Sequence, residues 1–133
     1  MENFDDKKKV LVVDDDNNLT HAMVDKLNMS GFNAVSEPNG EEGLKKAFEF
    51  HPDIIWLDLM MPKMGGIEML KRLRMDAWGK NVKVIVLTLL EQPNYIAEAM
   101  ENNISGYLVK INYDLDEIVT KLQDMLFIKH GPK

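Results

Sequence analysis

Short apolar runs alternate along the chain with segments in which apolar residues recur every three or four positions. Five runs have the length of strands: residues 10–13, 32–35, 54–57, 82–87 and 107–109. These runs are almost entirely apolar rather than alternating, which is typical of strands that are buried on both faces. The pattern therefore predicts a parallel sheet in the interior.

The segments between these runs have the spacing of amphipathic helices. Leu19, Met23 and Leu27 lie on one face of the first helix, and Ser30-Gly31 ends it. The second helix begins at Asn39-Gly40 and ends before Pro52. The third contains Ile67, Leu70 and Leu73, and the fourth begins at Pro93, a residue that suits the first position of a helix. The fifth has a continuous apolar stripe at positions 115, 118, 119, 122 and 126.

Strands that alternate with helices predict a fold of the α/β class, a doubly wound five-stranded parallel sheet with five helices on two faces. We expect the flavodoxin-like strand order 2-1-3-4-5, in which the ligand crevice lies between the carboxyl ends of the first and third strands.

Composition narrows the function classes. The chain has 133 residues, the size of one domain, and a net charge of -6. This charge argues against a direct nucleic-acid or membrane partner, because both are bound chiefly through Lys and Arg. There is no cysteine, and the longest apolar runs are too short to span a membrane. We expect a cytoplasmic location.

Four of the predicted strands end in residues that suit phosphoryl transfer to a carboxylate. Asp14-Asp15-Asp16, Asp58, Thr88 and Lys110 each follow an apolar run. Crowded carboxylates repel one another unless a cation lies among them, and Mg²⁺ prefers such oxygen ligands. We expect Asp15 and Asp58 to contact the metal and Asp14 to act through a water molecule.

Each of these residues also has a simpler interpretation. Asp14 to Asp16 can cap the following helix, and a solitary Asp58 can be a turn residue. Lys110 can face solvent, and Thr88 is a common strand residue. Their occurrence at four successive strand ends favours a shared site.

The motifs resemble the receiver domain of two-component response regulators, of the single-domain, chemotaxis-regulator-like kind. The matching segments are Val-Leu-Val-Val-Asp-Asp-Asp at 10–16, Pro-Asp-Ile-Ile-Trp-Leu-Asp-Leu-Met-Met-Pro at 52–62, Val-Leu-Thr at 86–88 and Ser-Gly-Tyr-Leu-Val-Lys at 105–110. We expect a polar lead-in at residues 1–8, the receiver domain at 9–127 and a short tail at 128–133.

The resemblance implies roles for the residues at the strand ends. Asp58 would accept a phosphoryl group from a sensor histidine kinase or a histidine phosphotransfer protein. Asp14, Asp15 and Asp58, with the backbone carbonyl of Met60, would hold Mg²⁺. The protein would then be a signalling switch and not a turnover enzyme, catalysing only its own phosphorylation and slow dephosphorylation.

The resemblance also implies how the switch would work. Thr88 and Lys110 would bind the phosphoryl group, and Tyr107 would turn inward as Thr88 moves. The output would be the face of the fourth helix, fifth strand and fifth helix, at residues 93–126. We expect this face to bind an unidentified downstream protein, because no effector domain follows, or to form a phosphorylation-dependent homodimer.

Four positions bear on how closely the chain follows the family pattern. Ile111 replaces the proline that usually follows the lysine in a cis peptide bond, and Leu89 replaces a small residue. Met60 and Leu90 flank the expected path of attacking water. Apolar side chains at both positions predict a long-lived phosphoryl-aspartate.

Other function classes compete with this interpretation. Ile111 and Leu89 would permit a receiver-like scaffold that is never phosphorylated. An aspartate-nucleophile phosphohydrolase would need a general acid two residues after Asp58, where Met60 cannot donate a proton. A flavin-binding protein would need a hydroxyl-rich phosphate loop after the first strand, where the chain has carboxylates.

Overall fold

Strands and helices alternate along the chain, as the apolar pattern predicts. This computed structural model describes residues 7–88, 93–110 and 113–127. The strands are β1 (Lys9–Val13), β2 (Asn33–Glu37), β3 (Ile54–Asp58), β4 (Lys83–Thr88) and β5 (Gly106–Val109). The helices are α1 (Asn17–Met29), α2 (Gly40–Phe50), α3 (Gly66–Arg74), α4 (Pro93–Glu101) and α5 (Leu115–Phe127).

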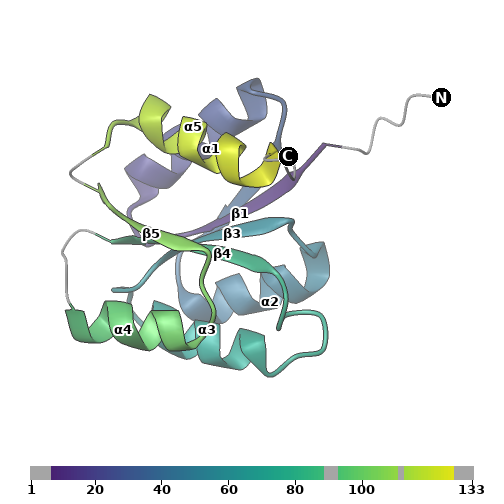
Figure 1. The fold of residues 1–133 in the computed structure, drawn as a ribbon. Helices are drawn as coiled ribbons and strands as arrows, with labels where there is room; N and C mark the ends of the chain where they lie inside the picture. Colours follow the sequence, from purple (N-terminus) through teal and green to yellow (C-terminus); the bar gives the residue numbers. More distant parts are fainter. Residues whose placement is uncertain (1–6, 89–92, 111–112, 128–133) are drawn as a thin grey trace, which may run out of the picture.

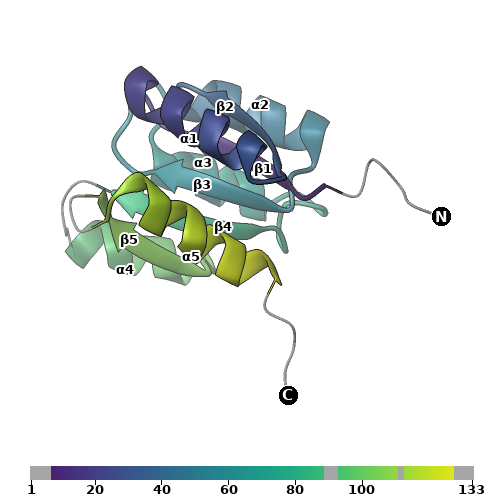
Figure 2. The ribbon, with the colours of Figure 1, turned by 90° about the horizontal axis from the view of Figure 1, so that it is seen from above.

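The strands form one parallel sheet in the order β2-β1-β3-β4-β5 (Figures 1 and 2). The predicted fold class and strand order are therefore confirmed. The register pairs Val13 with Leu57 and Asp58 with Leu87, and it pairs Thr88 with Val109. The carboxyl ends of β1, β3, β4 and β5 consequently lie side by side at one end of the sheet.

Helices cover both faces of the sheet. Helices α1 and α5 lie on one face, and α2, α3 and α4 lie on the other (Figure 1). Figure 2 shows α1 and α5 next to each other across their face, where Lys26 of α1 forms an ion pair with Asp116 of α5. Within the described ranges, no helix combines the length and hydropathy that a membrane span requires.

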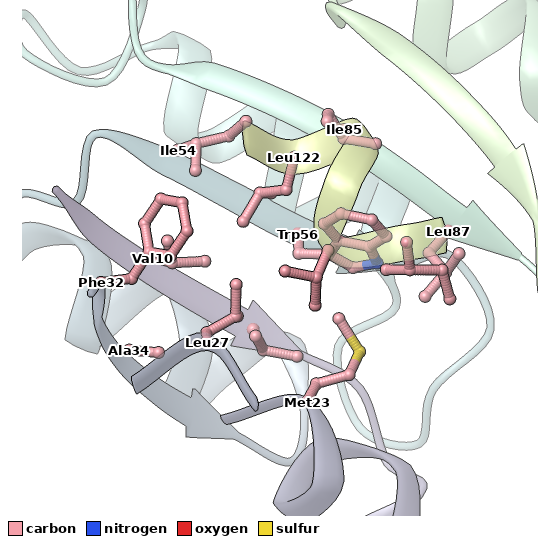
Figure 3. Packing of buried hydrophobic residues seen from close by; sticks show 13 residues of the cluster. Val10, Met23, Leu27, Phe32, Ala34, Ile54, Trp56, Ile85, Leu87 and Leu122 are labelled. Atoms are coloured by element: carbon pink, nitrogen blue, oxygen red, sulfur yellow. The ribbon is translucent and has the colours of Figure 1, made fainter. Parts of the chain in front are cut away.

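Alternate residues of the central strands supply two separate apolar layers. Trp56 of β3 is fully buried on the α1 and α5 side, among residues that include Met23 and Leu122 (Figure 3). Leu57, the next residue of β3, belongs to the opposite layer together with Leu70. This alternation follows from the two-residue period of a strand, and it explains why β3 has no polar position before Asp58.

Polar side chains define the beginnings of three helices. The Asp16 side chain accepts a hydrogen bond from Leu19 N (3.1 Å), and Asn39 accepts one from Glu42 N (2.9 Å). At α5, Asp114 and Glu117 each accept a bond from the other's backbone N–H, both at 2.9 Å, and so form a reciprocal capping box. The helix-cap interpretation of the acidic triplet is therefore confirmed for Asp16.

The strand boundaries differ from the apolar runs by one or two residues. β3 and β4 include Asp58 and Thr88, and β2 runs to Glu37 rather than ending at residue 35. The reason is that backbone hydrogen bonds define a strand, and the ladder continues past the last apolar side chain. The two polar residues therefore belong to the sheet itself, not to the loops that follow.

Candidate functional site

Three carboxylates meet at the carboxyl ends of β1 and β3. Asp14, Asp15 and Asp58 each place one oxygen within 4.8 Å of the others. Asp14 and Asp58 are buried, with 1% and 4% of their surface exposed, whereas Asp15 is exposed. The adjacency follows from the register of β1 and β3, which places the residues after Val13 and Leu57 at the same level.

Lys110, directly after β5, points its ammonium group into this acidic cluster. Its Nζ lies 2.7 Å from Asp14 Oδ2 and 3.9 Å from Asp58 Oδ2. The contact with Asp14 is an ion pair without the direction of a good hydrogen bond, and Asp14 Oδ2 has no other partner in the described part of the chain. Asp14 Oδ1 accepts a hydrogen bond from Asp16 N (2.9 Å). Lys110 therefore bridges the two buried carboxylates and lies nearer to Asp14.

The surroundings of Asp58 favour its neutral form. Burial is the largest cause and, with the nearby Asp14 carboxylate, raises the pKa of Asp58 to about 7. Lys110 and the N–H of Met60, which lies 3.4 Å from Asp58 Oδ1, act in the opposite direction. Asp58 is therefore a carboxylate whose ionisation at neutral pH depends on the positive charge beside it.

The donor set suits a hard divalent cation. Among the described residues, three carboxylates face one nearby ammonium, so the cluster keeps an excess of negative charge when all are ionised. Magnesium and similar cations bind carboxylate oxygens and retain several waters, and the exposed Asp15 leaves one side of the cluster open to solvent. Asp14, Asp15 and Asp58 could therefore hold a metal ion.

The other predicted site residues lie on β4 and β5. Thr88 is buried at the end of β4, next to the strand that carries Asp58. Tyr107 lies in β5, with 37% of its surface exposed. The structure thus brings Asp14, Asp15, Asp58 and Lys110 into direct proximity.

Some predicted features lie outside the described residues. These are Leu89 and Leu90 after β4, and the peptide bond between Lys110 and Ile111. Met60 is described, and its side chain is 53% exposed beside the cluster.

The sequence does not predict two sets of contacts, that of Gly40 near the site and that of Arg74 at the other end of the sheet. Gly40 N donates to Met64 O (2.9 Å), which joins α2 to the loop after β3. Arg74 donates to the carbonyls of Asn102 and Asn103 beyond α4, and to two further carbonyls before β4. The Asn-Gly pair at the start of α2 is a helix-start signal, but nothing in the sequence indicates which loop it contacts. Arg74 resembles any basic residue in the last turn of a helix.

Comparison with known proteins agrees with this geometry. Residues 10–123 match the family model described as the response regulator receiver domain. The chain therefore belongs to the receiver domain family of response regulators, which is a family of signalling domains and not of turnover enzymes.

Similar proteins include regulators that are longer than this chain. The DNA-binding dual master transcriptional regulator RpaA of Synechocystis is 30% identical over 118 residues, covering 89% of this chain and 48% of that protein. The hybrid signal transduction histidine kinase D of Dictyostelium discoideum is 31% identical over 128 residues, covering 96% of this chain and 8% of that protein. The chain thus spans about half the length, or less, of these curated relatives.

Solved structures share the fold over most of the chain. The chemotaxis protein CheY4 of Vibrio cholerae superposes with a TM-score of 0.83 at 30% identity, covering 90% of this chain and 99% of that one. A CheY-like receiver domain protein from Methanospirillum hungatei gives the same TM-score at 21% identity, a likeness of fold alone.

Proposed function

We propose that this chain is a phosphorylation-dependent switch that accepts a phosphoryl group on Asp58. The donor would be the phosphohistidine of a sensor histidine kinase or a histidine phosphotransfer protein. The observation that carries the proposal is the buried Asp58 carboxylate with Asp14, Asp15 and Lys110 around it.

Charge explains why this arrangement suits the reaction. An Asp58 oxygen would form the new bond to phosphorus as the bond between phosphorus and the donor nitrogen breaks. Lys110 lies close enough to offset negative charge on Asp58 or on an incoming phosphoryl group. Its nearer partner is Asp14, so a cation bound beside Asp14 would weaken that ion pair and favour a shift of Lys110 toward the phosphoryl group.

The residues fit Mg²⁺, which when bound would neutralise charge on the carboxylates and on the phosphoryl oxygens. Asp14, Asp15 and Asp58 would hold it, together with the backbone carbonyl of Met60 as the family resemblance implies.

Output would follow from a shift between two conformations. Thr88 would donate its hydroxyl to a phosphoryl oxygen, and the partly exposed Tyr107 would turn inward as Thr88 moves. The face formed by α4, β5 and α5 would then bind a downstream protein or a second copy of the chain. We place this activity in the cytoplasm, where a kinase donor and Mg²⁺ are both present.

Mass spectrometry after incubation with acetyl phosphate and Mg²⁺ tests the proposal. The unaltered chain should gain one phosphoryl group, and Asp58→Ala should gain none. Asp53→Ala is the matched control, because Asp53 precedes β3 at the opposite end of the same strand, where it accepts a bond from Lys9 N (2.7 Å). A chain that binds Mg²⁺ but is never phosphorylated would instead be a receiver-like scaffold.

The lifetime of the product tests the roles of Met60 and Leu90. Met60 presents an exposed apolar side chain beside Asp58, where it cannot orient water for attack. We expect Met60→Asn with Leu90→Glu to shorten the lifetime of phosphorylated Asp58. Rapid loss of the phosphoryl group from the unaltered chain, unaffected by these changes, would contradict this role.

A further inference from the structure

The loop that follows Asp58 is tied at both ends. It spans residues 59–65, and Gly66 N donates across its base to Leu59 O (3.0 Å). A Cβ atom at Gly66 would lie only 2.3 Å from Asp58 O, so α3 begins directly against the last carbonyl of β3. The path of this loop is therefore restricted where it leaves the strand and where it enters the helix.

A third contact joins the far part of the loop to α2. Gly40, the first residue of α2, donates its N–H to Met64 O at 2.9 Å. A Cβ atom at Gly40 would lie 2.4 Å from that oxygen and 3.0 Å from the carbonyl carbon, so only glycine allows this approach. The neighbouring Asn39 is buried and caps α2, so the donor belongs to a well-anchored helix start.

The loop held in this way includes the residue next to the proposed cation site. Met60 N lies 3.4 Å from Asp58 Oδ1, which places the Met60 peptide against the site. Between Met60 and Met64 the loop has three residues, one of them Lys63 with a φ of 62°. A displacement of the Met64 peptide is therefore passed to the Met60 peptide through a short, conformationally restricted segment.

We propose that Gly40 is a positioning residue for the cation site, acting through the Met64 carbonyl to fix the loop that presents the Met60 peptide beside Asp58. This inference rests on the proposed function, since it assumes that Mg²⁺ binds at Asp14, Asp15 and Asp58. Gly40 itself contacts neither the cation nor the phosphoryl group.

Calorimetric titration with Mg²⁺ alone tests the inference. We expect Gly40→Ala to raise the Kd for Mg²⁺ by roughly 10-fold, as is typical when a group that orients a metal ligand is lost. Gly79→Ala is the matched control, because a Cβ atom at Gly79 would lie 2.3 Å from the carbonyl oxygen of Leu73, a backbone clash of similar severity beyond the end of α3. This control should lower the thermal midpoint and leave the Kd for Mg²⁺ unchanged.

Hydrogen exchange on the unaltered chain tests the same coupling without a substitution. If the Gly40 to Met64 bond positions the site, Mg²⁺ must stabilise that bond in return. The Gly40 amide should therefore exchange more slowly at saturating Mg²⁺. The amide of Gly31, which precedes the amino end of β2 and so lies away from the site, should not change.

The outcomes separate the two proposals. Unchanged Mg²⁺ affinity in folded Gly40→Ala, or an unchanged Gly40 amide in the Mg²⁺-saturated chain, would overturn the positioning role alone. No Mg²⁺ binding by the unaltered chain would overturn the cation site itself, and the positioning role with it.

Discussion

Asp58 occupies an environment that opposes its own ionisation. It is buried, and the charged neighbours that most affect its pKa are the carboxylate of Asp14 and the ammonium of Lys110. A nucleophilic carboxylate must be ionised, so the raised pKa of about 7 makes reactivity depend on added positive charge. This dependence suits a site in which a cation and a phosphoryl donor arrive together.

The raised pKa of Asp58 predicts a pH dependence of stability. The folded chain binds this proton more tightly than the unfolded chain, so the stabilisation is fully present below about pH 4 and is lost as the pH rises through about 7. In Mg²⁺-free buffer at pH 8, Asp58→Asn should therefore exceed the unaltered chain in free energy of unfolding, by about 2 to 4 kcal/mol. Urea unfolding followed by circular dichroism measures this difference, which should shrink towards pH 4. A difference that is the same at both pH values would contradict the assignment.

Proton competition predicts a pH dependence of cation binding. Below pH 7, Mg²⁺ must displace the proton of Asp58, so affinity should fall as the pH falls. Between pH 8 and pH 6 the Kd for Mg²⁺ should rise about 10-fold, as expected for competition with one proton of pKa near 7. Calorimetry at the two pH values, in buffers of different ionisation enthalpy, also counts the protons released. Release of no proton at pH 6 would contradict the prediction.

At the scale of elements, Arg74 joins the ends of two helices to a loop. It lies at the end of α3 and donates to Asn102 O and Asn103 O beyond α4, as well as to Gly79 O and Val82 O before β4. Burial lowers the pKa of the Arg74 guanidinium below its usual value, but these carbonyls satisfy its donors. One side chain thus fixes α4, part of the proposed output face, against α3.

Arg74→Ala should be strongly destabilising, because it leaves partly buried carbonyls without donors. We expect a loss of about 3 kcal/mol in the free energy of unfolding, in line with the cost of unmet hydrogen bonds to charged groups. Arg72→Ala is the control: Arg72 forms an exposed ion pair with Glu68 (2.8 Å), and its loss should cost less than about 1 kcal/mol. Equal losses in the two variants, measured by urea unfolding, would show that Arg74 has no special role.

The sequence predicts the features that depend on the order of strands and helices. It does not predict where the strands end or which carboxylate Lys110 contacts. Buried strands and helical spacing predict the sheet, and the sheet order brings Asp14 next to Asp58. The strands β2, β3 and β4 extend past the predicted apolar runs because backbone pairing continues beyond the apolar side chains. The preference of Lys110 for Asp14 was not predicted either, because it depends on how β5 ends relative to β1, two strands that are not neighbours in the sheet.

For the whole molecule, the sheet separates two apolar layers that belong to different helices. Leu122 of α5 and Leu73 of α3 are both fully buried, but on opposite faces.

Because the sheet separates the two apolar layers, substitutions in different layers should have additive effects on the free energy of unfolding. Leu122→Ala and Leu73→Ala should each cost about 2 to 5 kcal/mol of unfolding free energy. Their combination should equal the sum to within about 0.5 kcal/mol, because the sites share no partners. Leu122→Ala with Met23→Ala, both beside Trp56 in Figure 3, should deviate from additivity by more than this. Additive behaviour in both pairs, measured as double-mutant cycles, would argue against two distinct layers.

The two tryptophans lie in contrasting places. Trp56 is sealed in the core on the same strand as Asp58 and two residues before it, whereas the half-buried Trp78 stacks on His51 with ring centroids 4.3 Å apart, before β4 begins. Collisional quenchers such as acrylamide should therefore reach Trp78 and spare Trp56. The residual emission would come from the indole two residues before Asp58 on the same strand, and the chain would carry its own optical probe of events at Asp58 without any attached dye.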